Sequence, residues 1–175
     1  MHVSRRLTLA ATALCLVALP GALEAQIGFL AGGGISSPLG DFADEAGTGY
    51  HLRAGFDGAI PTTPISVRID GDYHRLAEAD SGFESASVWA GAFSVVYRLP
   101  GVGIRPYLLG GIGKYRLKAG PAGMSTAVTD NGLHAGFGLN LGAIGFGGFV
   151  EIRYVQVNTA GDDTKYLPLT VGLRM

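Results

Sequence analysis

The sequence predicts an all-β fold, an eight-stranded antiparallel up-and-down β-barrel that spans a membrane and follows a cleavable signal peptide. Three observations lead to this prediction. The chain is apolar overall, with a mean hydropathy of +0.30, yet it has no apolar run of about 18 residues, the minimum for a spanning helix. Apolar and polar residues alternate along several segments. The connections between these segments alternate between long and short, as they do in transmembrane barrels.

The N-terminus has the three parts of a secretory signal peptide. Two arginines precede the uncharged run Leu7–Leu19, and Ala25 offers a small residue at the exit. The run has 13 residues, whereas a spanning helix needs about 20. We therefore expect residues 1–25 to be a signal peptide and residues 26–175 to form one barrel domain. The only cysteine, Cys15, leaves with the signal, so the mature chain has no disulfide.

Charge and hydropathy narrow the function classes. Without Arg5, Arg6 and Glu24, the chain's 13 cationic and 14 anionic residues become 11 and 13. This near-balance gives no electrostatic support for nucleic-acid binding, and we expect no such partner. A hydrophobic chain without spanning helices can cross a bilayer only as a closed barrel, because every backbone amide must be paired there.

Eight segments have the length of a tilted spanning strand, roughly 9–11 residues or slightly more. The alternation is clearest in the second and third, where Phe56 and Val67 belong to apolar sets and Asp57 and Arg68 to polar sets. The segments are Gln26–Ser36, Tyr50–Ile60, Ile65–Leu76, Ser85–Leu99, Ile104–Lys118, Gly132–Leu141, Phe146–Val157 and Lys165–Met175.

The connections predict the orientation. Short turns at Pro61–Pro64, Pro100–Gly103 and Gly142–Gly145 alternate with the longer Ser37–Gly49, Ala77–Glu84 and Ala119–Asn131, and Asn158–Thr164 is of middling length. Short turns face the periplasm in such barrels, so both termini of the mature chain are expected there. The longer loops are acidic, which either reflects ordinary solvent exposure or allows cations to bridge them to lipopolysaccharide. Their acidic residues are Asp41, Asp44, Glu45, Glu78, Asp80, Glu84, Asp130, Asp162 and Asp163.

Two stretches carry a resemblance to a known family. They are "RPYLLGGIGKY" at Arg105–Tyr115 and the ending "YLPLTVGLRM" at Tyr166–Met175. With the whole mature chain they resemble the OmpA/OmpX-like small barrels, the outer membrane protein beta-barrel domain family. The resemblance implies a porin-like shape, a place in the outer membrane at the Gram-negative cell surface, and a C-terminal strand that the barrel-assembly machinery reads. Family members commonly end in an aromatic residue, whereas this chain ends in Met175.

The inward faces of the segments predict a charged lumen. An eight-stranded barrel has an interior just wide enough for side chains to fill it, and buried charges must be paired there. If Ile60 faces Ile65 across the turn, Asp57 lies opposite Arg68 and Arg53 opposite Asp72. The expected lumen network is Arg53, Asp57, Arg68, Asp70, Asp72, Glu151, Arg153 and Arg174.

The opposite faces should meet lipid. The outward apolar set is expected to be Phe56, Trp89, Phe93, Tyr97, Leu133, Phe137, Leu139, Leu169 and Leu173. For the fifth segment both facings are open, and we favour the one with Tyr107, Leu109 and Tyr115 toward lipid and Lys114 and Arg116 in the lumen.

A packed polar lumen favours a monomeric structural or surface-interaction scaffold that contacts outer-membrane lipid and lipopolysaccharide. The alternatives are a narrow pore or small-solute transporter, and a lipid A-modifying hydrolase or acyltransferase. His51, His74 and His134 are expected at the outer rim in a hydrogen-bonded network. No Ser-His-acid spacing marks a catalytic site, although three histidines would suit zinc or copper. We assign no catalytic, cofactor-binding or metal-ligating residue.

Overall fold

The computed structural model describes residues 27–78, 84–120, 126–142, 147–158 and 163–175. Within them the chain forms antiparallel strands and one four-residue helix. The elements are β1 (Ile27–Leu39), α2 (Phe42–Glu45), β2 (Ala46–Ala59), β3 (Ile65–Glu78), β4 (Glu84–Arg98), β5 (Ile104–Gly120), β6 (Thr126–Gly142), β7 (Gly147–Val157) and β8 (Thr164–Arg174). No helix in the described part is long and apolar enough to cross a membrane.

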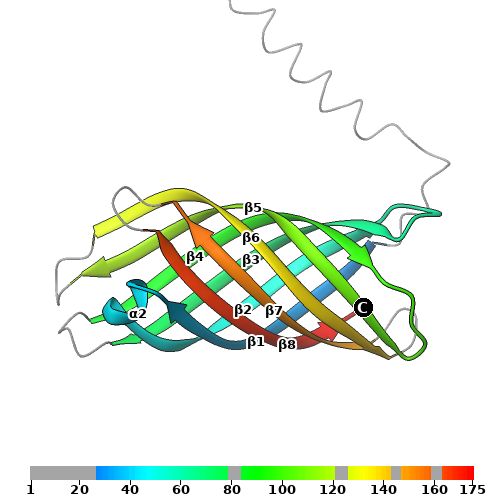
Figure 1. Ribbon diagram of the computed structural model, residues 1–175, viewed down its shortest axis with the longest axis horizontal. Coiled ribbons are helices and arrows are strands. Elements are labelled where there is room, and N and C mark those ends of the chain that lie inside the picture. Colours follow the sequence, from blue (N-terminus) through cyan, green and yellow to red (C-terminus); the bar gives the residue numbers. More distant parts are fainter. Residues whose placement is uncertain (1–26, 79–83, 121–125, 143–146, 159–162) are drawn as a thin grey trace, which may run out of the picture.

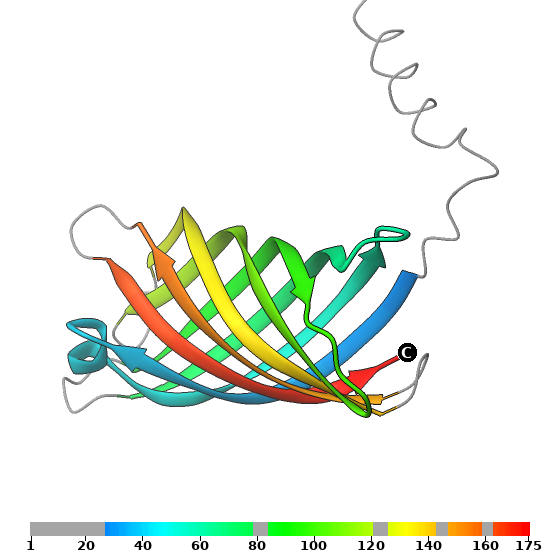
Figure 2. The same ribbon diagram turned by 45° about the vertical axis from the view of Figure 1, so that its right-hand side comes forward.

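The eight strands close into a barrel in sequence order, as predicted. Each strand pairs with its chain neighbours, and β1 also pairs with β8, from Leu30 opposite Arg174 to Leu39 opposite Lys165. The backbone amides of Phe29 and Met175 donate to each other's carbonyl oxygens at 2.8 Å. Figures 1 and 2 show the start of β1 and the C-terminus at one end of the barrel and α2 at the other. The barrel therefore has a terminal end and an α2 end.

Side chains alternate between a buried inner face and an exposed outer face. On β2, Arg53 and Asp57 are buried, while Leu52 and Phe56 are about 60% exposed, at 60% and 58%. An exposed apolar face is expected where lipid replaces water as the surroundings. Eight members of the predicted outward set are exposed, and the ninth, Leu139, is half-buried.

The predicted register between β2 and β3 is the one observed. The amide of Ile60 donates to the carbonyl of Ile65 at 3.0 Å, and the turn includes Thr62 with a positive φ of 62°. Asp57 then lies opposite Arg68, and Arg53 opposite Asp72. A slip of one residue would turn these charges toward lipid, so the turn fixes both faces of the hairpin.

Several predicted boundaries are wrong because strands extend into the expected loops. β1 continues through Ser37 and Pro38 to Leu39, and β5 and β6 pair as far as Ala119 opposite Thr126. Asp130, expected in a loop, lies in β6 opposite the buried Tyr115. The strands β1 to β6, with 13 to 17 residues, thus exceed the roughly 9–11 residues that crossing requires.

Other predictions fall outside the described residues. These are the signal peptide at residues 1–25 and the loop segments 79–83, 121–125 and 159–162, which include Asp80 and Asp162. The start of the first predicted strand, Gln26, and the turn 143–146 also lie outside them.

The favoured facing of the fifth segment is wrong. Tyr107, Leu109 and Tyr115 on β5 are buried in the lumen, at 0%, 5% and 3% exposure, whereas Lys114 and Arg116 are exposed on the outer face. The register explains the facing, because Tyr107 lies opposite the inward-facing Arg98. Directly opposed residues of two strands share a face.

Candidate functional site

The inward faces of the strands bring all eight predicted lumen residues into one network of charges. Asp57 and Glu151 have no exposed surface, and Arg68 and Arg153 are each 2% exposed. These groups come from β2, β3 and β7, with further arginines on β4 and β8. Only paired charges are tolerated at such burial, so the contacts of each carboxylate decide what the lumen can do.

Glu151, on β7, is the centre of the network. Its Oε1 accepts from Arg53 Nη1 at 2.5 Å and from Arg153 Nε at 2.5 Å, and its Oε2 accepts from Arg68 Nη1 at 2.6 Å. The hydroxyl of Tyr107 donates to Oε2 at 2.7 Å. Three guanidinium groups from three strands therefore meet at one carboxylate, and charge-assisted bonds of this kind are the strong ones.

Asp57, on β2, holds a second cluster of arginines. Arg68 donates to its Oδ2 from Nη2 at 3.0 Å and from Nε at 3.2 Å, which is a bidentate contact. Its Oδ1 lies 2.6 Å from Arg98 Nη2 and 3.2 Å from Arg174 Nη2. Arg98 and Arg174 are partly exposed, at 28% and 21%, so this cluster leads toward the terminal end of the barrel.

The remaining carboxylates complete a single connected network. Arg53 also pairs with Asp72, and Arg153 Nη2 lies 2.8 Å from Asp70 Oδ2. Since Arg68 joins Glu151 to Asp57, eight ion pairs connect four carboxylates with five arginines. A network of this connectivity ties β2, β3, β4, β7 and β8 together across the lumen.

A glycine makes room for the tyrosine of the network. Tyr107 on β5 lies directly opposite Gly138 on β6, and a Cβ added at Gly138 would be 2.2 Å from the tyrosine ring. The ring therefore lies across the glycine and brings its hydroxyl to Glu151. The guanidinium of Arg68 lies 5.3 Å from the ring centroid, within the range of a cation–π contact.

The three predicted histidines form two separate clusters in the lumen. Ser36 Oγ lies 3.0 Å from His51 Nδ1 and 2.8 Å from His74 Nδ1, and His51 Nε2 lies 2.8 Å from Thr170 Oγ1. His134 instead has Ser94 Oγ at 2.8 Å from its Nε2 and the Tyr115 hydroxyl at 3.3 Å from its Nδ1.

The histidine geometry bears on the metal and enzyme alternatives. The described residues contain no group of three or more histidine, cysteine, aspartate or glutamate side chains arranged to hold a metal ion. His51 and His74 are 1% and 2% exposed, and neither has a carboxylate among its hydrogen-bond partners in the described part. A serine–histidine–acid relay would require such a partner.

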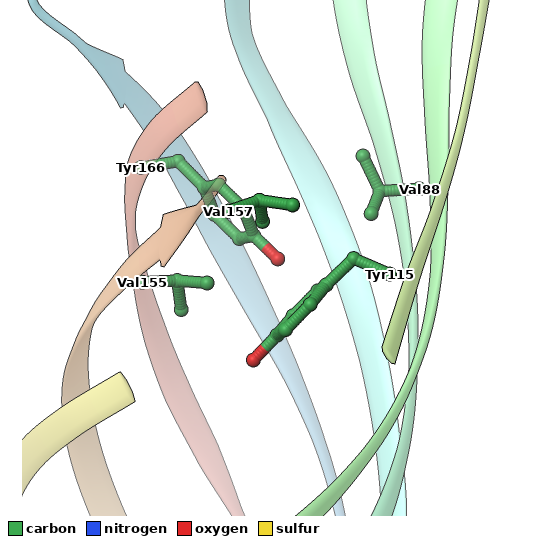
Figure 3. Close-up of a cluster of buried hydrophobic side chains, with 5 residues drawn as sticks. All are labelled: Val88, Tyr115, Val155, Val157 and Tyr166. Carbon is green, nitrogen blue, oxygen red and sulfur yellow. The ribbon is translucent and has the colours of Figure 1, made fainter. Parts of the chain in front are cut away.

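Apolar clusters fill the parts of the lumen beside the charges. Near the α2 end, Tyr115 and Tyr166 extend from opposite walls toward each other, with Val88, Val155 and Val157 around them (Figure 3). Val96, Tyr107 and Leu109 form another cluster beside the charged network, with Arg98 on its terminal side. The lumen is thus filled by a charged network together with apolar clusters.

Sequence reasoning missed part of this arrangement. It places Tyr107 and Tyr115 on the lipid face, and it does not single out the hydroxyls of Ser36, Ser94 and Thr170. A usable signal is present for Tyr107. Symmetric pairing across the short turn Pro100–Gly103 sets the inward position Arg98 opposite Arg105, and Tyr107 is on the same face as Arg105. In the structure the partner of Arg98 is Tyr107.

The fold is shared with solved outer-membrane proteins. Neisserial surface protein A aligns with a TM-score of 0.72 at 15% identity, covering 85% of this chain and 96% of that one. Ail, the attachment invasion locus protein of Yersinia pestis, aligns with a TM-score of 0.54 at 18% identity, covering 85% and 97%. The N-terminal β-barrel domain of Pseudomonas aeruginosa OprF gives 0.53 at 16% identity, covering 86% and 98%.

A comparison with curated proteins gives no match. The family comparison matches nearly the whole chain, residues 7–174, to the outer membrane protein beta-barrel domain. Together with the closed eight-stranded barrel, this match shows that the chain belongs to the outer membrane protein beta-barrel domain family.

Proposed function

We propose that this protein is a closed structural scaffold of the outer membrane, which presents the connections at its α2 end to the outside of the cell. The observation that carries the proposal is the connected network of eight ion pairs in the lumen, with apolar clusters packed beside it. A lumen filled in this way rigidifies the wall and leaves the connections to make outside contacts.

The same network argues against a solute channel. A solute crossing the lumen would have to displace Tyr107 or separate Glu151 from its three arginines. Breaking a buried pair costs about 3–5 kcal/mol when a charge is left without its partner. The apolar cluster of Tyr115, Tyr166 and three valines would add a dehydrated layer to the same path.

Single-channel recording in planar bilayers tests the closed lumen. We expect the purified protein to give no steady conductance under conditions in which a reference porin opens. Steady openings of uniform size that depend on this protein would contradict the scaffold and support the pore.

We further propose that both ends of the mature chain are periplasmic and that the α2 end faces outward. The short connections lie at the terminal end, which supports this orientation. The chain's only cysteine, Cys15, precedes the barrel, so single-cysteine variants test the orientation directly. In intact cells a membrane-impermeant maleimide should label Asp41→Cys beside α2, and Val102→Cys only after the outer membrane is permeabilised. Both native residues are exposed.

The barrel is proposed to be monomeric and to reach the membrane through recognition of β8 by the barrel-assembly machinery. Closure by β1 and β8 supports a monomer, because it leaves no edge strand to pair with another chain. Light scattering on the detergent-solubilised protein should give the mass of one chain, and a dimer mass would contradict this.

We propose no enzymatic activity. The burial of His51 and His74 and the hydroxyl partners of all three histidines support a structural role. Mass spectra of lipid A from cells with and without the protein should be identical. A new or missing acyl chain or phosphate would instead favour a lipid A-modifying enzyme.

A further inference from the structure

The corrected facing of β5 places a row of cations on the outside of the barrel. Lys114, Arg116 and Lys118 occupy alternate positions and are all exposed. Arg75 on β3 joins them, because it lies opposite Ser87 on β4, which in turn lies opposite Lys118. We call Arg75, Lys114, Arg116 and Lys118 the outer cation patch.

The outer cation patch has no charge partner in the part of the chain that the structure describes. The ion pairs found there involve the lumen arginines and Lys165, and none involves a member of the patch. Exposed cations on a lipid-facing wall are unfavourable near the bilayer centre, and this cost falls toward the interface. Their position should therefore mark where the wall leaves the hydrocarbon.

Aromatic residues beside the patch place it at that interface. Tyr73, Trp89 and Arg116 are direct neighbours across β3, β4 and β5, and the Tyr73 and Trp89 rings lie 4.7 Å apart. Tyrosine and tryptophan gather where the bilayer meets water. The patch thus begins at headgroup level, at the α2 end of the barrel.

The wall below the patch is apolar. One step toward the barrel centre, Ile69, Phe93 and Ile112 lie side by side and are 62%, 44% and 61% exposed. A ligand that matches this surface has acyl chains below and several negative charges above. Four cations spread over β3 and β5 suit two phosphates better than one, because each phosphate can accept from more than one donor.

We propose that the outer cation patch binds the headgroup phosphates of a bisphosphorylated glycolipid of the outer leaflet, whose acyl chains lie on Ile69, Phe93 and Ile112. The proposal rests on the orientation proposed above, which turns the α2 end toward that leaflet. The bound lipid fixes the depth and tilt of the barrel at its β3–β5 wall and adds a lipid contact to the scaffold role.

Trp89 gives the assay its signal. It is the only tryptophan of the chain and lies directly beside Arg116. The protein is purified from outer membranes in detergent, freed of bound lipid, and titrated with bisphosphorylated lipid A while Trp89 fluorescence is followed. Monophosphorylated lipid A and phosphatidylglycerol serve as comparison lipids.

The test variant is Arg116→Gln combined with Lys118→Gln. A cation at a lipid surface contributes about fivefold in affinity for anionic lipid, so the pair should raise the Kd for bisphosphorylated lipid A about 25-fold. Lys165→Gln is the matched control, because Lys165 is a cation near the α2 end that already lies 3.8 Å from Asp163. Its Kd should stay within about twofold of wild type, since a paired surface cation contributes little.

Four outcomes bear on the proposal. A rise in Kd confined to the double variant, with weaker binding of the comparison lipids, supports it. An unchanged Kd overturns it. Equal affinity for phosphatidylglycerol overturns the glycolipid assignment.

Heat-modifiable migration on gels shows whether the double variant is folded. If it is not, Lys114→Gln alone must raise the Kd about fivefold, and no rise overturns the proposal. Binding in detergent does not depend on orientation, so this test and the cysteine labelling can fail separately.

Discussion

Replacing Glu151 by glutamine should destabilise the barrel strongly, because this carboxylate is the partner of three arginines. The substitution keeps the side-chain size but removes the negative charge at a position with no exposed surface. Arg53 then keeps only Asp72, and Arg68 keeps Asp57. Three carboxylates then remain against five arginines, so the excess of positive charge in the network rises from one to two. Removing one partner from a buried ionic network costs about 3–5 kcal/mol, and we expect a loss in the free energy of unfolding of that size.

Urea unfolding in lipid vesicles, followed by the fluorescence of the single tryptophan Trp89, measures this loss. Lys165→Gln is a suitable control, because it breaks an exposed pair of 3.8 Å and should cost at most about 1 kcal/mol. The slope of the free energy with urea should be the same in both variants, since the same surface is exposed on unfolding. A loss for Glu151→Gln no larger than that of the control would refute the paired-lumen argument.

Two further substitutions test the inner and outer faces in the same assay. Gly138→Ala should cost about 1–3 kcal/mol through overpacking, because its new methyl group would meet the Tyr107 ring. Gly110→Ala is the control and should cost little, because the nearest atom to its new methyl group would be 3.7 Å away. Equal losses in stability for Gly138→Ala and Gly110→Ala would exclude the steric explanation. Leu169→Arg places a charge on the lipid face at the middle of β8 and should cost about 2–4 kcal/mol. A loss near zero for Leu169→Arg would mean that the faces are inverted.

The closed barrel and the lumen contacts between β2 and β3 are predictable from the sequence, because each rests on a periodicity. The two-residue repeat of a strand fixes which side chains share a face. A short turn then fixes which residues oppose one another. For β2 and β3 the turn at Pro61–Pro64 leads to the pairs Asp57–Arg68 and Arg53–Asp72, and both ion pairs are present.

Glu151 shows where this reasoning ends. Its inward facing follows from periodicity, but its contacts with Arg53 and Arg68 cross the lumen between strands that are not neighbours. Such contacts depend on the diameter of the barrel, the stagger of the strands and the reach of each side chain. No local pattern in the sequence determines the diameter, the stagger or the reach of the side chains.

The sequence predicts strands that are too short, because the contacts that extend them are also between strands. Polar and small residues such as Ser37 and Thr126 resemble loop residues, so composition places them outside the strands. Once neighbouring strands are in register, however, the hydrogen-bonded ladder can continue in water beyond the bilayer. Leu39 still pairs with Lys165, and Ala119 with Thr126.

The facing of β5 shows that register is a better guide than hydropathy in this barrel. Both faces of β5 are apolar, with Leu108 and Ile112 on one face and Tyr107 and Leu109 on the other. Hydropathy alone therefore does not decide which face meets lipid. The register across the turn at Pro100–Gly103 does decide, because it sets the inward Arg98 opposite Tyr107. The same parity that buries Tyr107 turns Lys114, Arg116 and Lys118 outward. The tyrosine that donates to Glu151 and the cations proposed to hold lipid phosphates are therefore two consequences of one register.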